Sequence, residues 1–167
     1  MTVRKVIKFP EKVLLKKTAK VKKVDPDLKA LARDMFDTMY VNEGVGLSAN
    51  QVGIGKRIAV INPTGKKKDE LVMINPEITK KEGTDKMEEG CLSMPGVYSE
   101  VKRAMAIEVK FLDLEGSAKT LRLEGLPARI VQHEVDHLNG NLFIHRIAPL
   151  KRSQLIKKYR CLKKSHK

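Results

Sequence analysis

Two histidines and a glutamate stand close together in the segment Gln132–His137, which reads Gln-His-Glu-Val-Asp-His. Residues four apart lie on one face of a helix, so His133 and His137 can direct a ring nitrogen at one metal ion. Glu134 follows His133 and can reach a water bound to that metal, where a carboxylate acts as a general base. The alternative is a helix that carries two solvent-facing histidines by chance. The pattern favours a metal-dependent hydrolase.

A third metal ligand has two candidates. His145 lies downstream, where metallopeptidases carry theirs, but its offset of eight residues from His137 gives it no special support, and we expect a surface or loop histidine. Cys91 lies upstream in the turn-rich segment Glu89–Gly96, and its thiolate would complete a His2Cys site with water in the fourth position. A lone free cysteine is more commonly a small buried hydrophobe. Beside the helix motif, Cys91 is the preferred ligand.

A third segment, Gly44–Gln51, is rich in small residues. Glycines let a substrate approach the backbone closely, and the Gln51 amide can donate to a developing oxyanion. An ordinary connection between a helix and a strand is the alternative. A phosphate-binding loop is excluded, because the lysine and the spacing of that motif are missing.

The elements that must position these segments can be read from capping and periodicity. Asp25 is a good N-cap with Pro26 at the first helical position, and apolar residues then recur at three- and four-residue spacing as far as Val41. Further helices are expected from about Leu126 to Leu138 and from about Pro149 to Lys164. Apolar runs or alternation predict strands at four ranges, the last two forming a hairpin: Arg57–Asn62, Leu71–Asn75, Ala104–Leu112 and Ala118–Glu124.

The order of these elements predicts an α+β fold. Mostly antiparallel sheets would pack around a central metal-binding helix, with N-terminal and C-terminal helices outside. In the last helix the candidate apolar positions are Leu150, Ile156, Tyr159 and Leu162. The chain has 167 residues and 41% hydrophobic residues without a long linker, so we expect one domain over residues 1–167.

Charge and composition bound the partners. The formal net charge is +14, and the stretch Arg146–Lys167 contains nine Lys or Arg residues and no acidic residue. Such a tail suggests attraction to a polyanion such as ribosomal RNA, although a generally basic proteome explains it equally well. We find no membrane span or secretory segment and expect a cytoplasmic protein with reduced cysteines. Cys161 is expected to have no catalytic part.

Taken together, the three segments resemble the peptide deformylases. That family is marked by Gly-x-Gly-Leu-x-Ala-x-Gln, Glu-Gly-Cys-Leu-Ser and Gln-His-Glu-x-Asp-His, which appear here in that order as Gly44–Gln51, Glu89–Ser93 and Gln132–His137. Ser48 stands where Ala is more usual. The resemblance covers essentially the whole chain. It implies removal of the formyl group from the N-terminal formyl-methionine of nascent polypeptides, with release of formate.

The resemblance also implies roles for single residues. Glu134 would take a proton from the metal-bound water and later deliver it to the leaving amine. The Gln51 amide and the Leu92 backbone N–H would stabilise the oxyanion. The metal ligands would be Cys91, His133 and His137. Ferrous iron is implied as the working metal, with zinc, nickel or cobalt able to occupy the site, whereas the ligands alone indicate zinc.

Substrate contacts follow from the same resemblance. Backbone groups of Gly46 would hold the substrate in an extended pose. The methionine pocket would be lined by the ring of His133 together with Val45, Leu126 and Ile130. Arg129 stands where an apolar residue often lines that pocket, and we expect its stem to pack there with its head in water.

Two supporting contacts remain open. Asp136 is expected to pair with Arg103, either anchoring the helix or as a solvent-exposed pair. Glu89 is expected to orient either the cysteine turn or the Gln51 region.

Two rival functions use the same residues differently. A metallopeptidase would use the same helix but would not need the Cys91 turn. A basic RNA- or ribosome-binding protein would leave the site degenerate, yet every expected ligand is present and no pattern of stacking aromatics is visible. The expected partners are therefore formyl-methionyl nascent peptides and, through the basic C-terminal helix at about residues 149–164, the ribosome. Neither a membrane nor a specific nucleic-acid sequence is expected.

Overall fold

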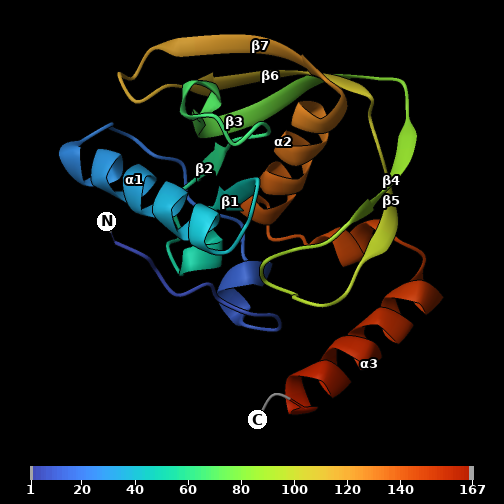
Figure 1. The fold of residues 1–167 in the computed structure, drawn as a ribbon. Helices are drawn as coiled ribbons and strands as arrows, with labels where there is room; N and C mark the ends of the chain where they lie inside the picture. Colours follow the sequence, from blue (N-terminus) through green and yellow to red (C-terminus); the bar gives the residue numbers. More distant parts are fainter. Residues whose placement is uncertain (1, 166–167) are drawn as a thin grey trace.

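The computed structural model of the chain describes residues 2–165 (Figure 1). In this part of the chain there are three α-helices, namely α1 (Pro26–Val41), α2 (Gly125–Leu138) and α3 (Pro149–Ser165). The strands are β1 (Gly46–Ser48), β2 (Ile58–Ile61), β3 (Leu71–Glu82), β4 (Asp85–Glu89), β5 (Ser99–Arg103), β6 (Ala106–Leu112) and β7 (Ala118–Glu124). Short 3₁₀ turns link several of these elements.

Antiparallel pairing organises all of these strands. Five of them form one sheet in the order β1-β2-β3-β6-β7, and β4 pairs with β5 in a separate ribbon. Helix α2 lies at the centre, with α1 on one side of it and the β4–β5 ribbon on the other (Figure 1). The predicted α+β class with mostly antiparallel sheets is confirmed.

Local signals account for helix α1. The Asp25 side chain accepts a hydrogen bond from the Leu28 N–H at 2.8 Å, and Pro26 occupies the first turn. The apolar side chains on the inner face of the helix are buried against β2, with Met35 and Met39 fully enclosed, whereas Tyr40 and Val41 at its end are exposed. The predicted start and end of this helix are therefore both confirmed.

The strands agree less closely with the sequence. β7 has the predicted bounds, whereas β3 runs on from Asn75 to Glu82. Register irregularities lie in this extension, and Asn75 has a positive φ of 54°. β1, β4 and β5 were not predicted, because their pairing partners rather than their apolar pattern define them.

Helix α2 packs its apolar face on the large sheet. Ala128, Val131 and Val135 join a buried cluster with Ile107 and Val109 of β6. Such burial is worth roughly 1.5–3 kcal/mol for each large aliphatic side chain. The sheet therefore fixes the position of the helix whose opposite face carries the histidines.

Helix α3 covers the other side of the Cys91 region. Tyr159 is buried and its hydroxyl donates to the Phe9 carbonyl at 3.1 Å, while Ile156 and Leu162 pack beside it. The expectation that Leu150 belongs to the apolar face of this helix is wrong, since its side chain is 72% exposed at the first turn.

No helix among residues 2–165 is both long and apolar enough to cross a bilayer.

Candidate metal centre

The C-terminal end of α2 is held by side chains from three other segments. Asn50 donates to the His137 carbonyl at 2.5 Å, and the Thr18 hydroxyl donates to the Leu138 carbonyl at 2.9 Å. Arg57 donates to the Asn139 side chain at 2.8 Å. These groups satisfy carbonyls that a helix end otherwise leaves unpaired, so the last turn is rigid where it carries His137.

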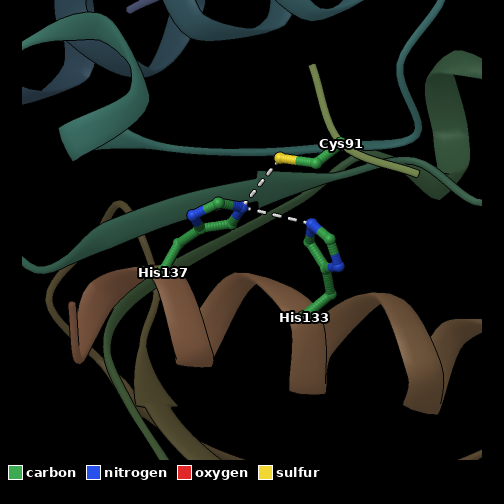
Figure 2. A group of neighbouring side chains, drawn as sticks. All are labelled: Cys91, His133 and His137. Atoms are coloured by element: carbon green, nitrogen blue, oxygen red, sulfur yellow. Dashed lines mark hydrogen bonds between the residues drawn. The ribbon is translucent and has the colours of Figure 1, made fainter. Parts of the chain in front are cut away.

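Three potential donor atoms converge at one point (Figure 2). His137 Nε2 lies 3.2 Å from Cys91 Sγ and 3.1 Å from His133 Nε2. All three atoms lie within 4.8 Å of one another. The histidines come from neighbouring turns of α2, and the cysteine comes from the loop that follows β4. The structure thus brings together the ligand set predicted from the sequence.

The donor set fits a divalent transition metal. His133 Nδ1 lies 3.0 Å from the Glu89 carboxylate, which selects the tautomer whose Nε2 lone pair faces His137 and Cys91. A thiolate and two imidazoles suit zinc or iron, and three protein ligands leave a position open for catalysis. The orientation of His133 is thus fixed from the far side of its ring.

The charge balance of the cluster also favours a cation. Burial by itself raises the pKa of the Cys91 thiol, but His137 and His133 together hold this pKa well below its usual value. Burial lowers the pKa of His133, whereas its hydrogen bonds with Cys91 and Glu89 raise it to about 10. The site therefore stabilises a thiolate and a positive charge beside it, a position in which a metal ion can replace a proton.

Glu134 lies next to the cluster and is only 3% exposed. Its Oε2 atom has no hydrogen-bond partner within residues 2–165. Burial raises the pKa of this carboxyl, and the opposing effect of His133 and His137 is smaller. A buried carboxylate with a free oxygen and a raised pKa is suited to accept and return a proton.

Gly46 makes the room that Glu134 occupies. A Cβ atom at Gly46 would lie 2.6 Å from Glu134 Oε1 and 2.8 Å from Ile130 Cγ2. The close approach of the β1 backbone to α2 thus requires glycine at this position.

The Gln51 side chain is held with its nitrogen toward Cys91. Its Oε1 accepts from the Ser48 N–H at 3.0 Å and from the Ser48 hydroxyl at 2.9 Å. Its Nε2 then lies 3.6 Å from Cys91 Sγ and 3.2 Å from Ser93 Oγ. Ser48 was noted in the sequence only as a departure from Ala; the structure shows that its hydroxyl helps to orient Gln51.

The Cys91 turn is anchored to the segment formed by residues 7–9. The Phe9 N–H donates to the Ser93 carbonyl at 2.9 Å, and Lys8 Nζ donates to the Leu92 carbonyl at 2.6 Å. The Ser93 N–H in turn lies 3.4 Å from Cys91 Sγ. Sequence reasoning did not identify Lys8, because its partner is 84 residues away along the chain.

A cavity of about 540 Å³ opens beside the cluster. Its lining includes all the side chains predicted for the substrate pocket, namely Val45, Gly46, Leu126, Ile130 and His133. Leu92, Gln51 and Glu134 line the same space. Met87 of β4 and Tyr98, in the loop before β5, also line it and were not predicted, because nothing in the sequence indicates that these segments flank α2.

Arg129 lines the cavity as expected, but the expectation that its head reaches water is wrong. Only 4% of this residue is exposed, and its guanidinium forms ion pairs with Glu89 and Asp85 instead of reaching water. Burial of an arginine is tolerated when carboxylates and carbonyls satisfy its donors. Glu89 accepts from Arg103 and His133 as well, so its side chain orients the metal-facing histidine rather than the cysteine turn or the Gln51 region.

Asp136 joins the same buried network. Its carboxylate accepts from Arg103 at 2.7 Å and from Arg146 at 2.9 Å, so the Asp136–Arg103 pair is an interior anchor. Burial raises the pKa of Asp136, but Arg146 and Arg103 lower it by more than burial raises it. The pKa of Asp136 is therefore below its usual value. His145 stands apart from the donor cluster in a 3₁₀ turn, where its Nδ1 accepts from the Leu142 N–H.

The histidine helix, the buried glutamate and the adjoining cavity define an enzyme of the hydrolase class. A family model described as polypeptide deformylase matches residues 3–153. The chain belongs to the polypeptide deformylase family. It is therefore an enzyme that removes N-formyl groups from peptides.

Individual relatives agree over nearly the full length. The peptide deformylase of Aquifex aeolicus is 46% identical, with 99% of each chain covered. That of Rhizobium meliloti is 44% identical over 95% of this chain and 93% of the relative. The crystal structure of a peptide deformylase from Legionella pneumophila superposes with a TM-score of 0.95 at 43% identity, covering 99% of this chain and 98% of that one. Fold and sequence thus point to the same family.

Proposed function

We propose that the chain hydrolyses the N-formyl group of formyl-methionine at the start of nascent polypeptides and releases formate, using a metal ion held by Cys91, His133 and His137. The observation that carries this proposal is the convergence of these three donors beside the free oxygen of Glu134, at the side of a cavity. Ferrous iron is the metal we expect in the cell, and zinc, nickel or cobalt can take its place in preparations.

A divalent cation lowers the pKa of a bound water from about 15.7 toward about 7, which supplies a nucleophile at neutral pH. Glu134 would accept a proton from the attacking water and deliver it to the amine that leaves. Its burial and raised pKa allow it to hold that proton between the two transfers.

Two donors would stabilise the oxygen that becomes negative during attack. Gln51 Nε2 is aimed at the cluster by the Ser48 contacts, and the Leu92 backbone N–H belongs to the anchored Cys91 turn. Donors fixed before the reaction stabilise an oxyanion without having to reorganise. We assign Gln51 and Leu92 this role.

The substrate is proposed to bind as an added strand. β1 is the edge strand of the large sheet, and Gly46 lies at its start beside Glu134. An extended peptide can pair with such an edge through main-chain hydrogen bonds. The methionine side chain would then enter the cavity between Val45, Leu126 and Ile130. A relative from Ehrlichia chaffeensis, 38% identical, was crystallised with actinonin, and we propose that this compound occupies the same cavity here.

Formate release from formyl-Met-Ala-Ser tests the proposal. Protein purified without oxygen is expected to release formate, to lose this activity on chelation and to regain it with ferrous iron. Acetyl-Met-Ala-Ser serves as the matched control substrate. A folded, metal-loaded sample that leaves the formyl peptide intact would refute the assignment and turn attention to peptide-bond cleavage.

We also propose that α3 contacts the ribosome and that residues 1–167 act as one cytoplasmic domain. Lys157, Arg160 and Lys164 are exposed and follow one another at helical spacing, whereas Tyr159 on the other face is buried. Deleting α3 would uncover Tyr159, so replacing the three basic residues by Gln is the better test. Salt-dependent co-sedimentation with ribosomes should weaken while small formyl peptides are still turned over. Unchanged co-sedimentation would contradict the ribosome contact.

A further inference from the structure

Arg129 contacts both ends of strand β4. Nη1 donates to Glu89 Oε1 at 2.7 Å, and Nη2 donates to the Asp85 carbonyl at 3.3 Å and pairs with the Asp85 carboxylate. Nη1 also donates to the carbonyl of Val101 on the neighbouring strand β5 at 2.9 Å. One buried guanidinium thus connects α2 to the first residue of β4, to its last residue and to its partner strand.

Met87 lies midway between the two residues that Arg129 holds. Side chains alternate along a strand, so Asp85, Met87 and Glu89 point to the same face of β4. Met87 also pairs in register with Val101, whose carbonyl accepts from Arg129. The Met87 side chain lines the cavity and is 43% exposed. The contacts of Arg129 therefore fix the position of Met87 from both sides and from across the ribbon.

The facing wall of the cavity comes from the helix that carries Arg129. Leu126, Arg129 and Ile130 of α2 line the same cavity as Met87 of β4. Glu89 is also held by His133 and Arg103, so its end of β4 stays near α2 independently of Arg129. Among residues 2–165, the polar contact that joins α2 to the Asp85 end of β4 is the ion pair between Arg129 and Asp85. The spacing of the two walls at that end thus depends on this arginine.

We propose that Arg129 determines which side chain the enzyme accepts at the first residue of its substrate. By holding β4 close to α2, it keeps the cavity narrow enough for the long, unbranched side chain of methionine and unfavourable for bulkier ones. This inference rests on the proposed function, because it concerns the same cavity. Arg129 acts on the substrate through Met87 and is a positioning residue.

Substrate selectivity in two variants tests the role. Asp85→Ala removes the carboxylate end of the contact and leaves Glu89 bound to Arg129, Arg103 and His133. With metal-loaded enzyme, its preference for formyl-Met-Ala-Ser over formyl-Phe-Ala-Ser, as a ratio of kcat/KM values, is expected to fall by about tenfold. The change should lie mainly in a lower KM for the phenylalanine peptide, with unchanged metal content and little change in kcat for the methionine peptide. Arg129→Met should lower the ratio further.

The matched control is Arg122→Met. Arg122 is an exposed residue of β7 that pairs with Glu82 of β3 and with Glu124, and it does not line the cavity. Its ratio should equal that of the unmodified enzyme. Amide hydrogen exchange in β4 should be faster in Asp85→Ala and unchanged in the control. A selectivity ratio within about twofold of the unmodified enzyme in metal-loaded Asp85→Ala would overturn the role of Arg129. Absence of formate from both peptides with the unmodified enzyme would instead overturn the proposed function.

Discussion

Replacing Gly46 by alanine should disable the enzyme without removing its metal ligands. The added Cβ would lie 2.6 Å from Glu134 Oε1, whereas ordinary contact begins at 3.4 Å. The carboxylate must therefore retreat by about 0.8 Å, or β1 must move away from α2 by a similar distance. A misplacement of about 1 Å costs roughly a hundredfold in rate, so we expect kcat to fall by about that factor. The crowding should also cost about 1–3 kcal/mol of stability.

The assay is formate release at saturating formyl-Met-Ala-Ser, together with metal analysis and urea unfolding of the same samples. Gly55→Ala is the matched control, because a Cβ there meets nothing within 4 Å. The control should keep its kcat. If Gly46→Ala retains kcat within about twofold at full metal content, the link between this glycine and the position of Glu134 is wrong.

Glu134→Gln should keep its metal, by metal analysis, and lose about 10²–10⁴-fold in formate release, because the proton acceptor is lost. Cys91→Ala should lose tight metal binding in equilibrium dialysis, since one of three donors disappears. Ser48→Ala keeps the N–H contact to Gln51 but loses the hydroxyl contact, so kcat should fall about two- to tenfold; an unchanged kcat would contradict this role. Burial raises the pKa of Asp136 but its two arginine partners lower it more, so its stabilising effect is complete above about pH 4 and disappears as the pH falls through the folded-state pKa. Asp136→Asn should flatten that acid dependence in urea unfolding.

Elements with strong local signals were predictable from the sequence. The Asp25 cap and the apolar stripe place α1, and the turn that separates β6 from β7 places that hairpin. The grouping of His133, His137 and Glu134 was also predictable, because the helical spacing of four residues survives in any fold that keeps the helix. Cys91 was favoured as the third donor by its turn-rich segment and by the family resemblance, and not by helical spacing.

Features that depend on distant partners were not predictable. β4 reads Asp-Lys-Met-Glu-Glu, a charged segment without a strand pattern, and only its pairing with β5 defines it. The burial of Arg129 was missed for a similar reason, since its carboxylates lie 40 and 44 residues away in sequence. An arginine on an apolar helix face reads as a side chain that extends to water unless its partners are known.

The hydrogen bonds of Phe9 have a consequence for the timing of synthesis. Its N–H donates to the Ser93 carbonyl and so supports the Cys91 turn, and its own carbonyl accepts a hydrogen bond from the Tyr159 hydroxyl. During synthesis Phe9 is made early, and Tyr159 follows 150 positions later in the chain. A growing chain can therefore carry all three metal donors and still lack the contact that completes the support behind them. The support behind the Cys91 turn is therefore complete only once Tyr159 has been made and α3 has packed on the segment that contains Phe9.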